Sequence, residues 1–494
     1  MDYKTAAERL RTLERRLFAL AYAENAVYLD SATVAPRDTS EGRGVALGEL
    51  SAWNHSLLVS DETRGLLRFL LECPECDPVV RREAEELERN LAWMNSIPED
   101  EYAAFATLTS DAEDTWHRAK ETNDFALFCP YLEKIVETSR RFAGYYDSSR
   151  PAYDVLLDRY ERGLTMSFLD RFFDSLRAET VPLLHAVSSR PAPDDSFLYR
   201  DYPVPAQREM TAYLLGVMGI PSGNCAVAET EHPFQITFDR RNVRIATHYY
   251  RDNIASSIYS ALHEGGHALY ELNYDARYEY TSLSGGASMS IHESQSRFYE
   301  NIIGRSEPFV EFFYPKLRSL FPSQLSGVSA HDFFRAVNRA QPSLIRTEAD
   351  ELTYPLHIMV RYELEKRLID GTLAVRDVPE AWNALYRDYL GIEVPDDTHG
   401  CLQDSHWSGG SIGYFPSYAL GSAYGAQMLA VMRRDVDVDA AASSGDLSPV
   451  TGWLREHIHR HACFYEPLEL LRRAVGEFDP KYYVDYLKQK FSSL

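Results

Sequence analysis

The sequence predicts a mainly α fold: a large helical protein of two lobes, with a small β-sheet or hairpin beside one central helix. Apolar residues recur at helical spacing along most of the chain, and the alternation typical of strands is confined to one short stretch. The 494 residues are 45% hydrophobic and 12% aromatic, which is enough for a large core and excludes a disordered chain. We find no repeat and no long linker that would separate independent domains.

The N-terminal segment is expected to form an amphipathic helix, because leucines at positions 10, 13, 17 and 20 lie three and four residues apart among Arg and Glu. Similar apolar stripes predict further helices at residues 80–96, 125–144, 153–161, 166–186, 205–218, 357–369 and 466–474. We expect one unit of residues 1–494, with an N-terminal helical lobe of residues 1–230 and a second lobe of residues 231–494.

The stretch between residues 232 and 250 is expected to form a β-hairpin. Apolar and polar residues alternate over 234–238 and again over 243–247, on either side of a short polar turn. Asp252 is expected to cap a helix that follows at once. The hairpin therefore leads directly into a helix.

The charge balance restricts the partners of the protein. Its 74 acidic residues against 51 Lys and Arg give a net charge of −23, which disfavours nucleic acid and anionic membranes. No stretch approaches the roughly 18 apolar residues of a membrane span, and the N-terminus lacks the apolar region of a secretory signal. Six scattered cysteines are too few for a disulfide framework. We expect a cytoplasmic protein.

The helix after the hairpin carries the sequence His263-Glu264-Gly265-Gly266-His267. Two histidines four residues apart project from one helical face and can bind one Zn²⁺, while Glu264 can act on the attacking water. The alternative is a polar stripe on a surface helix. Each glycine costs about 1 kcal/mol relative to Ala in a helix, so close approach by a neighbouring element or by substrate is expected there.

A catalytic zinc site needs a third protein ligand and one open position. The metzincin pattern is excluded because Tyr270 and Asn273 stand where Gly and His would be required. A carboxylate from the next helix, expected over residues 290–304, is the other standard solution, and Glu293 is best placed. The alternative is a capping box, in which Glu293 holds the backbone amide of Ser290.

Several motifs then follow in an order that resembles the carboxypeptidase Taq family of metallocarboxypeptidases. The motifs are HPF at 232–234, HEGGH at 263–267, HESQS at 292–296, IRTEAD at 345–350, GCLQDSHW at 400–407 and GYFPSY at 413–418. The family's D-x-R-x-T motif is kept only at its arginine, Arg244. The resemblance is dense over residues 232–421 and fainter toward both ends.

The resemblance implies a zinc enzyme, with Co²⁺ or another divalent metal as possible replacements, that releases C-terminal residues from peptides with a free C-terminus. It also implies a homodimer, and it places His406 and Tyr414 near the oxyanion of the reaction. We expect Arg346 to bind the terminal carboxylate of the substrate, with Arg244 as second choice and His232 as a further contact.

These site residues have structural alternatives. His406 and Tyr414 can instead be core packing residues, and Arg346 can be a buried ion-pair partner of Asp350 or Glu348. For the whole protein, the alternatives are a zinc oligopeptidase that cleaves internally and a helical binding protein without activity.

Two further clusters are not expected to carry chemistry. Cys73 and Cys76 have C-x-x-C spacing but no second pair, so we expect a loop between helices. His457, His459, His461 and Cys463 are not expected to form a second metal site, because only His457 and His461 share a helical face, and we expect that face to be solvated.

Overall fold

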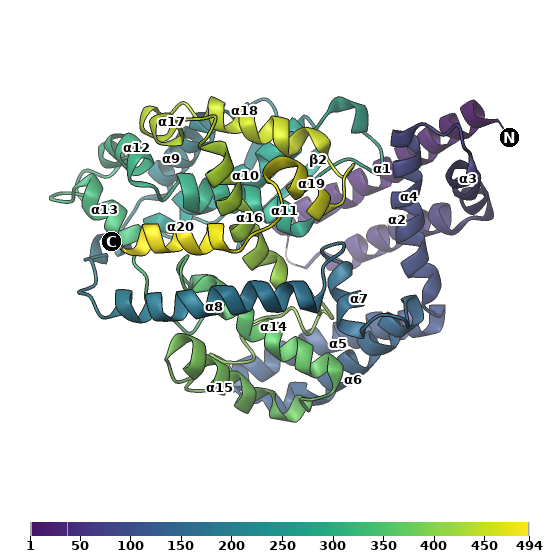
Figure 1. Ribbon diagram of the computed structural model, residues 1–494, viewed down its shortest axis with the longest axis horizontal. Coiled ribbons are helices and arrows are strands. Elements are labelled where there is room, and N and C mark those ends of the chain that lie inside the picture. Colours follow the sequence, from purple (N-terminus) through teal and green to yellow (C-terminus); the bar gives the residue numbers. More distant parts are fainter. Residues whose placement is uncertain (1, 37, 493) are drawn as a thin grey trace.

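A computed structural model describes residues 2–36, 38–492 and 494, and in this part of the chain it contains twenty α-helices and one three-stranded sheet (Figure 1). The helices up to the sheet are α1 (Tyr3–Thr33), α2 (Ser40–Val59), α3 (Asp61–Glu72), α4 (Pro78–Ser96), α5 (Glu99–Thr122), α6 (Phe125–Tyr146), α7 (Ala152–Asp158), α8 (Met166–Ser188) and α9 (Val204–Val217). The strands are β1 (Cys225–Glu229), β2 (Phe234–Asp239) and β3 (Asn242–Thr247).

The remaining helices follow the sheet. They are α10 (Ile254–Asn273), α11 (Met289–Arg297), α12 (Glu307–Leu320), α13 (Ala330–Val337), α14 (Tyr354–Asp370), α15 (Val378–Leu390), α16 (Pro416–Met432), α17 (Val438–Ser444), α18 (Ser448–His457), α19 (Pro467–Val475) and α20 (Lys481–Ser492). A π-helical stretch, η3 (Phe298–Ile303), continues α11. Every helix predicted from an apolar stripe is present, and the mainly α prediction is confirmed.

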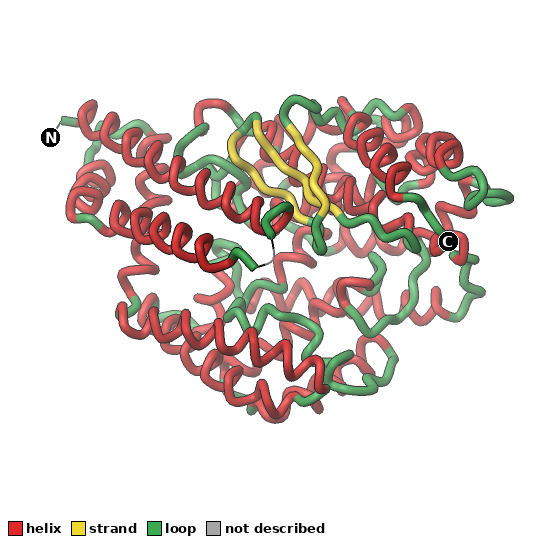
Figure 2. The backbone as a smooth tube through the Cα atoms, turned by 180° about the vertical axis from the view of Figure 1, so that it is seen from behind, coloured by secondary structure: helices red, strands yellow, loops and turns green. Residues whose placement is uncertain are grey.

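The predicted hairpin is confirmed, because β2 pairs antiparallel with β3, which follows it along the chain. The sheet also contains β1, which sequence analysis missed and which pairs parallel with β3 to give the order β1-β3-β2. Figure 2 shows the three strands side by side. The central strand β3 buries Val243, Ile245 and Ala246, and α10 packs against β3 and β2. The sheet therefore supports one side of α10.

Two large apolar clusters fill most of the interior, and a third, small cluster contains Tyr274, Tyr278, Leu283 and Ala462. The larger includes buried residues from Ala112 to Phe491 and surrounds α10, α11, α14 and α16. The smaller lies in α1, α3 and α4, from Ala6 to Leu91, in the arm that carries the N-terminus in Figure 1. The larger cluster runs across residue 230, and the division into lobes at that position stays a prediction.

The start of α10 differs from the prediction by one residue. Asn253, not Asp252, is the cap, because its backbone is extended and its side-chain oxygen accepts a hydrogen bond from the amide of Ser256 at 3.2 Å. The expected cap is one residue too early for this contact.

Among the helices of the described residues, none has both the length and the apolar character that a membrane crossing requires.

Candidate metal centre

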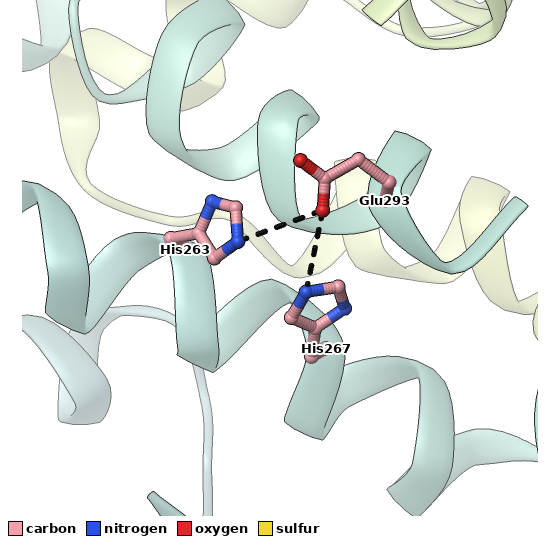
Figure 3. A group of neighbouring side chains, drawn as sticks. All are labelled: His263, His267 and Glu293. Carbon is pink, nitrogen blue, oxygen red and sulfur yellow. Dashed lines mark ion pairs between the residues drawn. The ribbon is translucent and has the colours of Figure 1, made fainter. Parts of the chain in front are cut away.

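Three side chains on two adjacent helices converge. His263 and His267 lie one turn apart on α10, and Glu293 faces both from α11 (Figure 3). The Nε2 atoms of His263 and His267 each lie 3.6 Å from Oε2 of Glu293. Within the described part of the chain, these residues form the one group of three possible ligands whose atoms lie close enough together to share a metal ion. The three atoms all lie within 4.8 Å of one another.

Close helix packing explains the two glycines of the HEGGH segment. A Cβ added at Gly266 would lie 2.5 Å from the carbonyl oxygen of Gln295 on α11, so only glycine allows this approach of the two backbones. A Cβ at Gly265 would lie 2.7 Å from the flexible side chain of Met218. The approach therefore comes from neighbouring elements, one of the two explanations expected from the sequence.

The capping alternative for Glu293 is wrong. The cap of α11 is Ser288, whose hydroxyl accepts a hydrogen bond from the amide of Ile291 at 3.1 Å. The amide of Ser290 instead donates to the buried carboxylate of Glu161 at 3.1 Å. The helix begins two residues earlier than a box at Ser290 requires, so Glu293 faces α10.

The second ring nitrogen of each histidine has its own partner. Nδ1 of His263 lies 2.8 Å from Oε2 of Glu300, and Nδ1 of His267 lies 2.7 Å from Nδ1 of His292. These contacts leave both Nε2 atoms turned toward Glu293. Two imidazoles and one carboxylate with an open side suit a catalytic divalent metal.

Arg297 lies between the two carboxylates of this centre. Its Nε donates to Glu293 at 2.8 Å and its Nη1 donates to Glu300 at 3.0 Å. Burial raises the pKa of both carboxyls, but Arg297 and the nearby histidines outweigh it, so the pKa of Glu300 falls to about 2 and that of Glu293 falls well below its usual range. Both carboxylates are therefore ionised at neutral pH.

Glu264 has a different environment. It is only 6% exposed, and burial raises its pKa to about 7. Among the ion pairs of the described residues, none joins Glu264 to a guanidinium, in contrast to Glu293. A carboxyl with a pKa near neutral beside the ligands suits proton transfer.

The comparisons with known proteins identify the family. The model of the family described as Carboxypeptidase Taq (M32) metallopeptidase matches residues 9–491. The chain belongs to this family. It is 40% identical to carboxypeptidase 1 of Bacillus subtilis, over 100% of this chain and 99% of the relative, and 36% identical to thermostable carboxypeptidase 1 of Pyrococcus furiosus, over 97% and 96%.

Solved structures agree with this assignment. The M32 carboxypeptidase of Deinococcus radiodurans matches with a TM-score of 0.97 at 34% identity, covering 99% of both chains. The apo-Mg structure of Pyrococcus furiosus carboxypeptidase matches with a TM-score of 0.96 at 35% identity, covering 98% of this chain and 99% of that one. As a carboxypeptidase Taq family member, the protein is a metallocarboxypeptidase, a peptide hydrolase that uses a divalent metal.

Arg346 of the family's IRTEAD motif is buried and strongly paired. Its Nε and Nη2 donate to Oδ1 of Asp404 at 2.9 and 2.8 Å, and its Nη1 donates to the hydroxyl of Tyr354 at 2.8 Å. The ion-pair partner is therefore Asp404, and not the Asp350 or Glu348 weighed from the sequence. Arg361 also pairs with Asp404, at 2.5 Å, so two guanidiniums share one carboxylate.

His406 and Tyr414 lie beside each other in the family's other two motifs. Their ring centroids are 5.5 Å apart, and Nδ1 of His406 is a buried atom without a hydrogen-bond partner among the described residues. Burial and the nearby Glu293 raise the pKa of the Tyr414 hydroxyl. Tyr414 therefore stays protonated and lies within electrostatic range of Glu293.

Arg244 and His232 belong to the sheet region. Arg244 lies on β3, donates to the carbonyl of Val243 at 3.0 Å and packs over the ring of Phe238. It borders an open cavity of about 540 Å³ at the β2–β3 turn. His232 is exposed in the connection between β1 and β2.

The two clusters set aside in the sequence have different outcomes. Cys73 and Cys76 lie in the loop between α3 and α4 as free thiols, as predicted. The predicted solvated helix face of His457 and His461 does not form, because α18 ends at His457 and both side chains are partly buried. His459 is 0% exposed and donates from Nε2 to Oε1 of Gln295 at 2.9 Å. Helix α18 ends at His457, and a short 3₁₀ turn then carries His459 into the core.

The sequence missed the groups that support the ligands. Glu300, Arg297, His292 and Glu271 were not predicted in this role. One signal was available, because Arg297 and Glu300 lie four and seven residues after Glu293 and so share its helical face.

Proposed function

We propose that the metal of this carboxypeptidase is Zn²⁺, held by His263, His267 and Glu293, with Co²⁺ or another divalent ion able to replace it. The convergence of the three ligand atoms carries this proposal. Tetrahedral coordination with bonds of about 2.1 Å puts neighbouring ligand atoms about 3.4 Å apart, and both His–Glu separations are 3.6 Å. The two His–Glu separations are therefore close to those that such an ion requires.

A bound Zn²⁺ supplies a Lewis acid that polarises a peptide carbonyl and acidifies a water molecule. Glu264 is proposed as the general base that takes a proton from the attacking water and passes it to the leaving amine. Its burial and its pKa of about 7 support this role, because the carboxylate can both accept and return a proton near neutral pH.

Tyr414 and His406 are proposed to stabilise the oxyanion. The raised pKa of Tyr414 keeps its hydroxyl as a hydrogen-bond donor, and its electrostatic coupling to Glu293 supports a position beside the ligands. The unpartnered Nδ1 of His406 is available for a further hydrogen bond.

Recognition of the substrate carboxylate is proposed for Arg346. The pairing of two guanidiniums with one carboxylate, Asp404, leaves a net positive charge in this cluster, which favours an anion nearby. Three N–H groups of Arg346 donate hydrogen bonds to Asp404 and Tyr354, so only its remaining N–H groups can bind substrate. Arg244 and His232 are proposed as contacts of the peptide farther along the sheet.

A cytoplasmic location and a homodimer are also proposed. The six cysteines are all free thiols, which supports a reducing compartment. The homodimer is supported by the family resemblance. Peptides with a free C-terminus are the proposed substrates, and the net charge of −23 speaks against nucleic acid.

The deciding experiment compares wild type with Glu264→Gln, using matched peptides that end in a free acid or an amide. We expect Glu264→Gln to keep one zinc per chain and to lose about 10² to 10⁴ in kcat, the usual cost of removing a general base. Amidation should abolish turnover by wild type. Undiminished cleavage of amides would favour the internal-cleaving oligopeptidase, and no turnover of either peptide by zinc-loaded wild type would favour a binding protein.

A further inference from the structure

We propose that His292 and Glu271 form a hydrogen-bonded relay that fixes the imidazole of His267 for metal binding, and that Gly286 holds the relay in place. His292 and Glu271 are positioning residues, because they act on the metal through His267. The inference rests on the metal centre proposed above and adds residues that neither ligate the ion nor contact substrate.

The distances define the relay. Nδ1 of His267 lies 2.7 Å from Nδ1 of His292, and Nε2 of His292 lies 2.8 Å from Oε1 of Glu271. His292 stands on α11 next to Glu293, whereas His267 and Glu271 lie one turn apart on α10. The relay therefore runs from α10 to α11 and back to α10, and it connects the helices that carry the ligands.

The positions of the protons follow from one requirement. His267 turns Nε2 toward Glu293, so a metal there requires Nε2 without a proton, and the proton of the neutral ring resides on Nδ1. Nδ1 of His267 then donates to Nδ1 of His292, which must accept. His292 carries its own proton on Nε2 and donates it to the carboxylate of Glu271. Each group has one role, and together they select the tautomer of His267 that can ligate.

The other histidine ligand is held differently. His263 donates from Nδ1 directly to Glu300 at 2.8 Å, with no ring between them. His267 reaches its carboxylate through His292, so the orientation of His292 has to be fixed independently. A freely rotating ring at this position could not hold His267.

The loop before α11 supplies that restraint. A Cβ added at Gly286 would lie 2.5 Å from Cδ2 of His292 and 2.8 Å from the ring of Tyr270, so the glycine backbone lies directly against both rings. The amide of Gly286 also donates to Oε1 of Glu271 at 3.1 Å. The next amide, of Ala287, donates to the hydroxyl of Tyr270 at 3.0 Å. The loop thus contacts both members of the relay.

The test measures zinc affinity by competition with a chromophoric chelator, in the full-length protein. His292→Ala should weaken zinc binding by about 10- to 100-fold, the usual effect of removing a group that orients a metal ligand. His292→Gln should recover part of this loss, because its amide can accept from His267 and donate to Glu271. Gly286→Ala should also weaken binding, although it removes no polar group.

The matched control is His331→Ala. His331 pairs with Glu307 at 2.6 Å through Nδ1, but both side chains are exposed and lie on other helices, so zinc affinity should not change. The melting temperatures of the zinc-free proteins separate positioning from general stability. We expect His292→Gln to match zinc-free wild type in melting temperature while binding zinc more weakly.

Two results would overturn the proposal in different ways. Wild-type zinc affinity in both His292→Ala and Gly286→Ala would reject the relay and leave the metal centre intact. Retention of one zinc per chain by His263→Ala with wild-type affinity would reject the metal centre itself, and the relay with it.

Discussion

The protein contains two pairs of buried glutamates that differ in their positive partners. At the candidate metal centre, Glu293 and Glu300 both pair with Arg297. Glu300 also pairs with Arg305, and Glu293 lies near His263 and His267. In the N-terminal arm, Glu14 on α1 and Glu83 on α4 share a single guanidinium, that of Arg11. The side chains of Glu14 and Glu83 are 1% and 0% exposed, against 10% and 12% for Glu293 and Glu300, so all four are nearly or fully buried.

The number of cations decides the charge of each pair. Burial raises the pKa of Glu83 to about 8, with a further contribution from Glu14, and burial also raises the pKa of Glu14. Oε2 of Glu83 has no hydrogen-bond partner among the described residues. The arm pair is therefore suited to hold a proton, whereas the pair at the metal centre stays ionised and is suited to hold a cation.

The largest effect is expected for Glu293→Gln. It replaces a charged ligand by a neutral one and leaves Arg297 with one carboxylate fewer. An uncompensated buried charge costs about 3–5 kcal/mol, which corresponds to a loss of about 10² to 10⁴ in zinc affinity. Isothermal titration of the zinc-free protein measures this, and unchanged affinity would place the third ligand elsewhere.

Arg297→Met removes the cation that distinguishes the two pairs. Glu293 and Glu300 then face each other with less compensation, and the free energy of unfolding of the zinc-free protein should fall by about 3–5 kcal/mol. The control is Arg64→Met, because Arg64 pairs with Asp61 at 3.9 Å on the surface and such pairs contribute about 0–1 kcal/mol. Equal losses in denaturant titrations of both variants would contradict the comparison.

Gly421→Ala tests the packing that holds Glu293 in place. An added Cβ on α16 would lie 2.7 Å from both Cβ and Cγ of Glu293. Overpacking of this kind costs about 1–3 kcal/mol, and zinc affinity should fall because the carboxylate is displaced. Gly425→Ala is the matched control one turn later, where the nearest atom would lie 3.4 Å away. A larger loss of zinc affinity in Gly425→Ala than in Gly421→Ala would contradict this prediction.

The effect of Glu83→Gln should appear as a pH dependence of stability. The folded pKa of Glu83, about 8, lies above its ordinary value of 4.5, so the wild type is most stable below that ordinary value and loses stability as pH rises through 8. The Gln variant lacks this loss, so it should gain stability relative to wild type between pH 5 and pH 8.5. Unfolding at both pH values tests this, with the exposed Glu62→Gln as control. A difference in unfolding free energy between the variant and wild type that is the same at both pH values would contradict the prediction.

Much of the fold could be predicted because an amphipathic helix can be recognised from the spacing of apolar residues within its own short stretch of sequence. The stripes gave α4, α6 and α8 nearly to their ends. Helix α2 was not predicted and has no buried residue, so it carries no apolar stripe to detect. Strand β1 was missed because its five residues show no alternation of buried and exposed positions.

The candidate site also has one part that could be predicted from local sequence and one part that could not. His263, Glu264 and His267 lie within one helical segment, so their spacing alone predicts the metal helix. The partner of Arg346 is Asp404, 58 residues away, and Glu293 packs on Gly421 from a third helix. Such contacts depend on how helices are arranged in space, and no local pattern encodes that arrangement.

The packing of α11 against α16 also bears on how the enzyme is made. All three proposed ligands have left the ribosome once residue 293 has. The surface that holds Glu293 nevertheless comes from Gly421, and the partner of Gln295 is His459, near the end of the chain. The N-terminal part contributes Glu161, which accepts hydrogen bonds from Ser288 and from the amide of Ser290. A growing chain therefore lacks the finished site until nearly its whole length has been synthesised.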